Sequence, residues 1–328
     1  MLLSYAILLI SVIVIYYSCE LFVNAIEWVG KKINVSQCAI GTILAAFGTA
    51  LPESVVTFMA VTFNATPQQQ DIGVGAALGG PLVLGTLAYA VTGFCILLFR
   101  KQRDQGLSIQ VDGRKLRHDQ LWFAFIFIFK LLLGITVFAF KPLTGFLFLA
   151  AYALYFYKEM RAECDLKLAD MTPLTFQPNQ LEPDTFRVLL QTTLSLTLIF
   201  ISSHFFVKNL ELLSVVWNVS PLVVSLLLSP VATELPEILN AVIWVRQGKE
   251  SLALSNISGA MMIQATVPSA LGLFFTPWLF DRHLWAAGIM TLVSISYLLF
   301  TLKRNQLSPK RLLVAALFYL LFSLIFFI

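Results

Sequence analysis

The stretch Thr49-Ala50-Leu51-Pro52-Glu53 recurs as Thr233-Glu234-Leu235-Pro236-Glu237, and each copy lies in the middle of a long apolar segment. A carboxylate at bilayer depth costs about 2.5–3.5 kcal/mol on insertion scales, so a protein seldom places one there without a function. The offset between the copies is 237 − 53 = 184 residues, and the same offset aligns two further pairs, Asn34-Val35-Ser36 with Asn218-Val219-Ser220 and Gly75-Ala76 with Gly259-Ala260. The sequence therefore predicts two repeats.

The composition is that of a membrane protein. Hydrophobic residues make up 58% of the chain, charged residues only 12%, and the mean hydropathy is +0.83. A soluble domain carries about 25% charged residues. Because a spanning helix needs about 20 apolar residues, we expect an all-α integral membrane protein with ten transmembrane helices, at Leu2–Val29, Val35–Phe63, Ile72–Phe99, Leu121–Phe140, Leu143–Tyr157, Phe186–Leu210, Val219–Val245, Leu252–Phe275, Leu284–Leu302 and Leu312–Ile328.

The distribution of Lys and Arg predicts the orientation of these helices. Of the 22 basic residues, 18 fall in one alternating set of loops and three (Lys141, Lys208 and Arg282) in the other, while Lys130 lies inside a span. Basic loops face the cytoplasm, so both termini are expected outside, in a prokaryotic inner membrane. The net charge of +4 is thus a topology signal and not a sign of nucleic-acid binding.

Two halves of five helices each follow from this count. We expect a first repeat at residues 1–157, a polar cytoplasmic linker at 158–185 and a second repeat at 186–328. An odd number of spans makes the second repeat enter the membrane in the opposite direction, so the repeats are inverted. Secondary transporters are built in this way, with the ion site near the midplane on interrupted helices. Prolines and a glycine predict the interruptions, at Gly48 and Pro52 in the second helix and at Pro230 and Pro236 in the seventh.

The repeated motif offers oxygen ligands for a cation. Glu53 and Glu237, one from each repeat, are expected to meet at the pseudo-twofold axis, and Thr49 and Thr233 lie one turn earlier on the same helix face. Ca²⁺ takes six to eight such oxygens, and Na⁺ accepts the same atoms at lower charge. No Cys or His accompanies the glutamates, which disfavours a soft metal. The alternative is a protonated glutamate that only joins two helices.

The segments Gly48–Glu53 and Ala232–Glu237 resemble the α-repeats of the sodium/calcium exchanger family, within the cation/calcium exchanger superfamily. The family pattern is Gly-Thr-Ser-x-Pro-Glu, and its Thr, Ser and Glu bind Ca²⁺ or Na⁺. The resemblance implies a sodium/calcium exchanger-like fold with Thr49, Glu53, Thr233 and Glu237 as ligands. It also implies that Ser and Asn or Asp of a Gly-Ser-Asn-x-x-Asn/Asp motif in the next helix complete the site.

This chain departs from that pattern at several ligand positions. The first-motif serines are Ala50 and Glu234, and the later serines are Ala76 and Ala260. The final positions of the second motif are Gly80 and Gln264. By position, Glu234 and Gln264 are therefore expected to join the metal ligands. Because Glu234 adds a third carboxylate, a proton or a further monovalent cation is expected to accompany Ca²⁺.

These residues favour a secondary antiporter that exchanges Ca²⁺ for Na⁺ by alternating access, with no cofactor beyond the transported ions. A cation/H⁺ exchanger and a degenerate repeat protein that binds ions without transport remain alternatives. An intramembrane hydrolase is disfavoured because no span contains an Asp pair, HExxH or GxSxG. The oligomeric state is left open.

Other polar groups in the apolar segments are less informative. Glu20 and His204 occupy equivalent repeat positions, as do Glu27 and Glu211, and either reach toward the interface or take part in gating. Lys130 is expected to extend toward the interface, with pairing to a buried carboxylate as the alternative. The four cysteines form no CxxC pair, so no disulfide is expected.

Overall fold

The structure is a computed structural model, and it describes residues 2–62, 67–161, 171–216, 226–227, 229–304 and 306–326. Regular structure in these ranges is entirely helical. The elements are α1 (Leu2–Lys32), α2 (Gln37–Ala39), the π-helix η1 (Ile40–Ala45), α3 (Ala46–Thr62), α4 (Pro67–Val83), the π-helix η2 (Leu84–Ala88), α5 (Tyr89–Leu98), α6 (Gly113–Leu133), the 3₁₀-helix η3 (Lys141–Thr144), α7 (Gly145–Arg161), α8 (Thr185–Val216), α10 (Ser229–Thr233), α11 (Leu235–Arg246), α12 (Glu250–Phe275), α13 (Arg282–Lys303) and α14 (Pro309–Phe326).

Five helices in these ranges are long and apolar enough to cross a membrane, namely Ser4–Lys32, Gly73–Leu98, Thr185–Phe206, Glu250–Phe275 and Arg282–Lys303. The expected span Leu121–Phe140 is wrong at its end, because α6 stops at Leu133 and Gly134 caps it. The all-α membrane fold is confirmed. The count of ten spans and the domain boundaries stay predictions.

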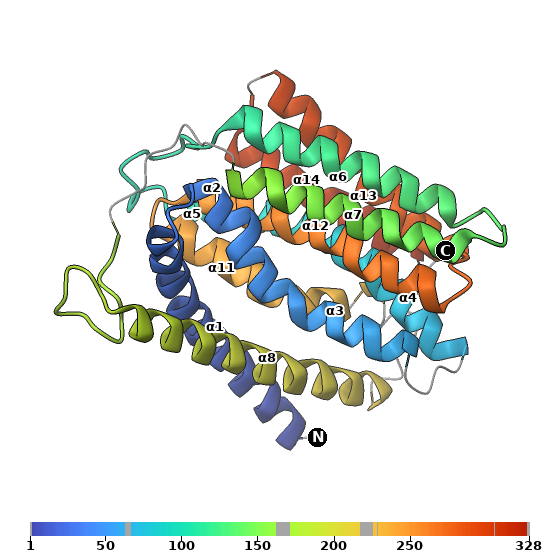
Figure 1. Cartoon of the computed structure of the whole chain (residues 1–328), viewed down its shortest axis with the longest axis horizontal. Helices are drawn as coiled ribbons and strands as arrows, with labels where there is room; N and C mark the ends of the chain where they lie inside the picture. Colours follow the sequence, from blue (N-terminus) through green and yellow to red (C-terminus); the bar gives the residue numbers. More distant parts are fainter. Residues whose placement is uncertain are drawn as a thin grey trace.

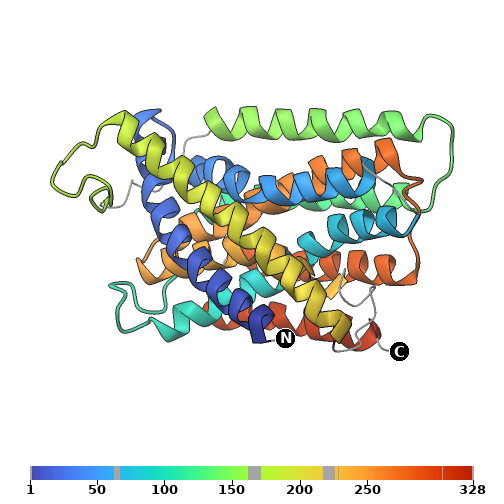
Figure 2. The ribbon, with the colours of Figure 1, turned by 90° about the horizontal axis from the view of Figure 1, so that it is seen from below.

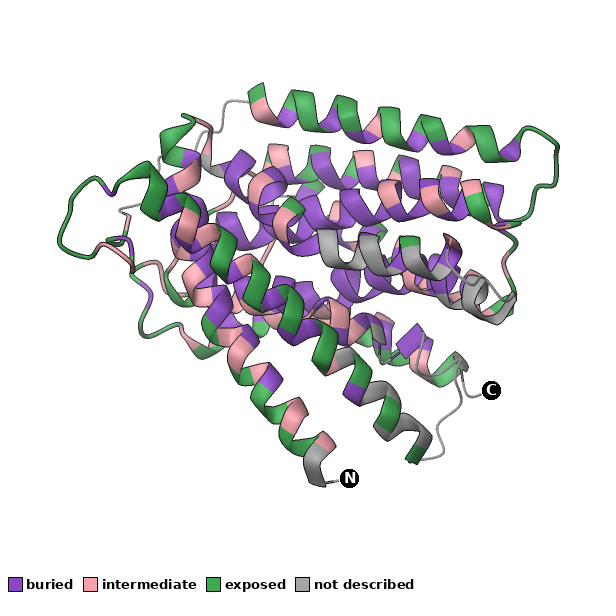
Figure 3. Ribbon diagram, turned by 60° about the horizontal axis from the view of Figure 1, so that its bottom comes forward, coloured by how far each residue is buried: buried purple, intermediate pink, exposed green. Residues whose placement is uncertain are grey.

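Helix α12 forms the centre of the bundle. Nearly all of its residues are buried, and it packs against α3, η1, α4, α6, α7 and α11. Figure 1 shows α12 running between α7 and α3, and Figure 3 shows that the exposed residues gather on the outer helices. A helix enclosed on all sides belongs to the core of a large helical protein. The third helix of the second half is thus the element on which the others are assembled.

The contacts repeat when the two halves are exchanged. Helices α1 and α8 pair along their length and cross the other helices obliquely (Figure 2). Helix α7 packs on α12, and its counterpart α14 packs on α5 and η2. Similarly, α6 contacts α12 while α13 contacts α4. Two inverted repeats would produce this reciprocal pattern.

Backbones approach most closely where α12 crosses η1. A Cβ atom on Gly259 would overlap the carbonyl group of Thr42, and one on Gly41 would lie 2.7 Å from the Cβ of Ser255. Small residues at such crossings let helices in membranes pack backbone to backbone. The repeated Gly75-Ala76/Gly259-Ala260 pattern therefore has a packing role in its second copy.

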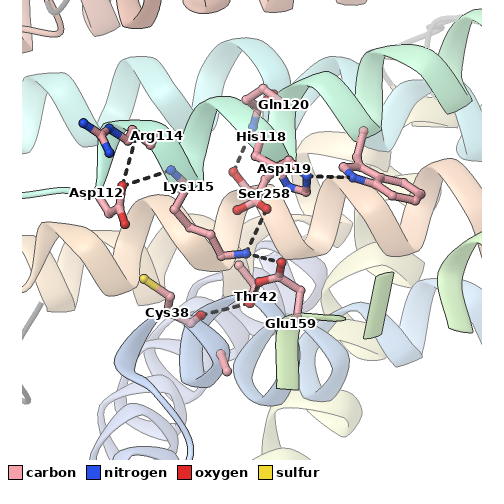
Figure 4. A network of polar contacts seen from close by, with 12 residues as sticks. Cys38, Thr42, Asp112, Arg114, Lys115, His118, Asp119, Gln120, Glu159 and Ser258 are labelled. Atoms are coloured by element: carbon pink, nitrogen blue, oxygen red, sulfur yellow. Dashed lines mark hydrogen bonds and ion pairs between the residues drawn. The ribbon is translucent and has the colours of Figure 1, made fainter. Parts of the chain in front are cut away.

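Charged side chains join the helices at the end of the bundle that carries the basic loops. This end, called here the basic end, is formed by the ends of α1, α5, α7 and α11 and by the starts of α6, α8 and α12. Lys115 of α6 contacts Glu159 of α7 and lies 3.1 Å from Asp119 (Figure 4). Thr42 of η1 donates to Glu159 at 3.0 Å. Half-buried Lys115 therefore joins a carboxyl group of α6 to one of α7, and Glu159 extends the contact to η1.

Further contacts close the same end. Lys249 lies 2.5 Å from Glu27, which also accepts a 3.0 Å hydrogen bond from the indole of Trp244. Arg103 pairs with Glu250, and both side chains are buried. Buried charges cost free energy unless they are paired, so these pairs fix α1, the loop after α5, and α12 relative to one another.

One expectation about the cysteines is wrong. Cys19 and Cys95 are buried free thiols, as expected for packing residues. Cys38 is disulfide-bonded instead. Spacing along the sequence does not reveal which cysteines meet between distant segments.

We expect Gly259→Ala to destabilise the protein strongly, because the added methyl group meets backbone atoms of Thr42 that cannot rotate away. Overpacking of this kind costs about 1–3 kcal/mol or more. The matched control is Gly113→Ala, since nothing lies within 4 Å of a Cβ there. Apparent Tm in detergent should fall for the first variant only, and equal values would contradict the close approach.

Asp119 lies before the expected span Leu121–Phe140, and burial, together with the charge of Glu159, raises its pKa to about 8. Between the ordinary Asp value of about 4 and 8, the folded protein holds a proton that the unfolded chain releases, so this group's contribution to stability falls as pH rises. Asp119→Asn removes this dependence. Its apparent Tm relative to the wild type should increase from pH 5 to pH 8.

The control for this titration is Asp112→Asn. Asp112 caps α6 by accepting hydrogen bonds from the backbone N–H groups of Arg114 and Lys115 at 3.0 Å, and Asn caps a helix equally well. Its Tm difference from the wild type should not change over the same pH range. A constant difference for Asp119→Asn would show that Asp119 does not hold the proton.

Candidate functional site

The seventh expected helix is broken at the repeated motif. Helix α10 ends at Thr233 and α11 begins at Leu235, with Glu234 between them. The backbone N–H of Glu234 donates to the carbonyl of Pro230 at 3.0 Å, and Glu234 in turn accepts from Ile238 at 3.1 Å. The interruption expected near Pro230 and Pro236 is therefore present, and it presents Glu234 at a helix junction.

The first repeat is interrupted at a different place. Helix α3 continues from Ala46 to Thr62, so no break occurs at Gly48 or Pro52, and that expectation is wrong. The irregular segment is the π-helix Ile40–Ala45 directly before it. Short π-helical segments often accompany functional sites. The hydropathy of the sequence does not distinguish these backbone hydrogen-bond patterns.

Glu234, Glu237 and Gln264 are buried, with relative exposures of 0%, 1% and 1%. The side-chain amide of Gln264 in α12 donates a hydrogen bond from Nε2 to Oε1 of Glu234. Glu237 follows Glu234 by three residues, about one turn along α11. The two helices thus bring together two of the expected ligands, Glu234 and Gln264, in a direct contact.

The two threonine hydroxyls point back toward their own helices. Thr49 is buried and donates to the carbonyl of Ala45 at 3.1 Å, while Thr233 is half-buried and donates to the carbonyl of Pro230 at 3.2 Å. A hydroxyl that donates its proton in this way still has oxygen lone pairs to offer. The expected role of both threonines as cation ligands stays a prediction.

The Glu53 side chain lies outside the described residues, so its expected meeting with Glu237 stays a prediction. Within the part of the chain that the structure describes, no three His, Cys, Asp or Glu side chains cluster in a way that could hold a metal ion.

Helix α4 brings its second-motif residues to the same region. A Cβ atom on Gly79 would lie 3.1 Å from the Cβ of Pro230, so α4 and α10 are in close contact. Ala76 and Gly80 flank this point on α4 and offer no side-chain oxygen. Helix α4, which has no side-chain oxygen at these two positions, thus packs next to the junction of α10 and α11 that carries Glu234.

Lys130 does not extend to the interface. It is fully buried in α6, and its ammonium donates a 2.6 Å hydrogen bond to the carbonyl of Ala77 in α4. Pro81, four residues later, has no N–H with which to bond that carbonyl. The expected extension toward the interface is wrong because the lysine has an acceptor inside the bundle.

Two buried asparagines were not predicted from the sequence as candidate site residues. Asn240 follows Glu237 by three residues, Asn256 lies on α12 near the basic end, and both are fully buried. Their side-chain amides have no hydrogen-bond partner within the described residues. Buried amides of this kind are commonly satisfied by water. An Asn within an apolar segment is the sequence signal that could have identified them.

The remaining polar groups have structural partners or lie at the surface. Glu20 pairs with Arg246 at 3.3 Å and accepts a hydrogen bond from Tyr16, and Glu27 is buried against Lys249. His204 is exposed, and the Glu211 side chain lies outside the described residues. Glu27 therefore does not reach toward the interface, although Glu20 is partly exposed there.

Curated relatives match most of this chain. It is 26% identical to the inner membrane protein YrbG of Escherichia coli, covering 93% of this chain and 90% of that protein. It is 27% identical to the putative antiporter CaxA of Alkalimonas amylolytica, covering 94% and 92%. Both relatives extend over the two halves and the linker between them.

Solved structures share the fold. The sodium-calcium exchanger NCX_Mj, soaked with 2.5 mM Na⁺ and 0.1 mM Ca²⁺, superposes with a TM-score of 0.76 at 19% identity, over 98% of this chain and 97% of that chain. The family model for the sodium/calcium exchanger protein matches residues 3–158 and 187–328. The chain therefore belongs to the sodium/calcium exchanger protein family, as a multi-pass membrane protein and a cation antiporter, not an enzyme.

Proposed function

We propose that this protein exchanges Ca²⁺ for Na⁺ by alternating access at a site near the bilayer midplane. Glu53 and Glu237 are the central ligands, and Thr49, Thr233, Glu234 and Gln264 surround them. The observation that carries the proposal is the buried contact between Glu234 and Gln264 at the junction of α10 and α11. It joins two positions that the family pattern assigns to ion ligands.

The chemistry of these groups suits a hard cation. Carboxylate, amide and hydroxyl oxygens are the ligands that Ca²⁺ and Na⁺ accept, whereas softer metals favour sulfur or imidazole. Ala50, Ala76, Ala260 and Gly80 remove side-chain oxygens from the family pattern. Glu234 returns two oxygens and a charge at one of those positions. The proposed site is therefore richer in charge and poorer in hydroxyls than the pattern it resembles.

Carboxylates at the site also explain why the carrier would exchange ions and not change orientation while empty. Glu237 and Glu234 lie about one turn apart in a buried environment, and like charges in such surroundings repel strongly. An empty site is then unfavourable in the occluded state, so the carrier changes orientation only with ions bound. This penalty couples the outward flux of one ion to the inward flux of another.

The ion that drives Ca²⁺ transport can be identified by uptake measurements. Reconstituted protein should take up ⁴⁵Ca²⁺ when an outward Na⁺ gradient is imposed. Uptake driven only by a pH gradient would identify a Ca²⁺/H⁺ exchanger. Binding of ⁴⁵Ca²⁺ without uptake under either gradient would identify the degenerate, non-transporting alternative.

We place the protein in a prokaryotic inner membrane with both termini outside. The basic end of the bundle then faces the cytoplasm, as the positive-inside rule requires. The clustering of Lys115, Arg246 and Lys249 at that end supports this orientation.

We expect Glu237→Gln to reduce Na⁺-driven ⁴⁵Ca²⁺ uptake to the level of empty liposomes. The amide keeps the volume of the side chain but removes the charge that binds the cation. The control is Glu20→Gln, which changes a half-exposed carboxylate outside the proposed site and should retain most of the uptake. Retained uptake in Glu237→Gln would exclude Glu237 from the site.

We expect accessible cysteines to report the proposed orientation. Ser108 lies exposed in the loop after α5, and Ala139 lies exposed in the loop after α6. In a background without native cysteines, a membrane-impermeant maleimide added to intact cells should label Ala139→Cys but not Ser108→Cys. Labelling with the opposite pattern would invert the topology.

A further inference from the structure

Lys130 lies in the interior of the bundle without reaching water. Its relative exposure is 0%, and its ammonium lies 5.1 Å from the ring of Phe127 and 5.8 Å from that of Trp278. The indole of Trp278 also donates to the carbonyl of Lys130 at 3.4 Å. An ionised side chain at such a depth is costly, so a functional role is the default expectation.

The position of the ammonium connects it to the proposed ion site. The ammonium donates a hydrogen bond to the carbonyl of Ala77 on α4. Ala77 lies between Ala76 and Gly80, the two positions at which the family pattern has ion ligands. Two residues further, Gly79 packs on Pro230, whose carbonyl accepts the backbone N–H of Glu234. Two residues of helix rise about 3 Å and four residues about 6 Å. Lys130 therefore lies on the order of 10 Å from the Glu234 backbone.

The charges of the proposed site do not balance with Ca²⁺ alone. Glu53, Glu234 and Glu237 carry three negative charges, and one Ca²⁺ supplies two positive ones. A surplus charge is unfavourable in a medium of low dielectric constant. A resident positive charge at this distance would bring the total to −3 + 1 = −2, which one divalent ion or two monovalent ions neutralise.

We propose that Lys130 serves as a tethered monovalent cation that offsets the charge of Glu234, so that the site presents two net negative charges to the transported ions. This inference rests on the proposed function. It makes Lys130 a specificity-determining residue, because it sets the total charge that bound ions must supply. One Ca²⁺ then exchanges for two monovalent cations without net charge movement.

Replacement of a lysine that has only a structural role should have different effects on transport. Lys141 offers the comparison, because its ammonium donates to the carbonyls of Thr136, Pro277 and Trp278 at 2.8–3.0 Å at the opposite end of the bundle. It binds backbone oxygens as Lys130 does, but away from the site. Lys141→Met therefore reproduces the loss of a lysine–carbonyl contact without changing the charge near Glu234.

The experiment compares Lys130→Met, Lys130→Arg, Glu234→Gln and the double variant Lys130→Met/Glu234→Gln by initial ⁴⁵Ca²⁺ uptake. Removing the positive charge should lower the KM for Ca²⁺ about tenfold and slow turnover, and removing the negative charge should raise KM about tenfold. The double variant should return to within about threefold of the wild type, since the two charges offset each other. Lys130→Arg and Lys141→Met should keep the wild-type KM.

The inference is overturned if Lys130→Met leaves the KM for Ca²⁺ unchanged or raises it, or if Lys130→Met and Lys141→Met behave alike. A second readout does not depend on transport. The apparent Tm of the purified, ion-free protein should fall for Lys130→Met, which leaves the carboxylates without an offsetting charge, and recover in the double variant, whereas a double variant no more stable than Lys130→Met would overturn the pairing. Recovery of Tm in the double variant, together with no ⁴⁵Ca²⁺ uptake by the wild-type protein, would retain the pairing and reject the proposed function.

Discussion

The structure depends on how an apolar bundle accommodates buried charge. At the basic end, the carboxylates of Glu27, Glu159 and Glu250 each lie against a Lys or Arg from another segment. Breaking such a pair leaves an uncompensated charge and costs about 3–5 kcal/mol. The helices therefore cannot separate at this end without exposing these charges to water. At the level of the proposed ion site, Glu234 accepts a hydrogen bond from the neutral amide of Gln264.

The opposite end is held together by different chemistry. Lys141 fastens the turn after α6 to the backbone at Pro277 and Trp278, and Gly272 leaves room for the Trp278 ring against α12. Aromatic rings of Trp278, Phe280 and Trp285 follow one another in edge-on contacts. These contacts are less charged than those of the basic end. The bundle is thus closed by ion pairs on one side and by rings and carbonyl contacts on the other.

Much of this organisation could be predicted from the sequence, because hydropathy and a repeated motif report burial directly. Alignment of both repeats with a family pattern indicated Glu234 and Gln264 as ligand positions, but it did not predict the hydrogen bond between them. The direction of Lys130 could not be predicted, because it depends on the carbonyl that Pro81 leaves free on another helix. Likewise, Lys115 and Glu159 lie 44 residues apart, and neither shows in sequence that the other is its partner. The position of the first interruption was wrong because π-helical and α-helical segments have the same apolar composition.

The π-helix Ile40–Ala45 determines which way the second helix of the bundle faces. A π turn contains about one residue more than an α turn, and one residue corresponds to about 100° of rotation around the axis. Gly41, inside this segment, lies against α12, and Thr49 follows on α3 with its side chain buried. Loss of a single residue here would restore an ordinary α-helix and turn Thr49, together with all that follows it on α3, about a quarter of a revolution away. The direction in which Thr49 points around the helix axis is therefore set by one extra residue, which lies a full turn or more before it in the chain.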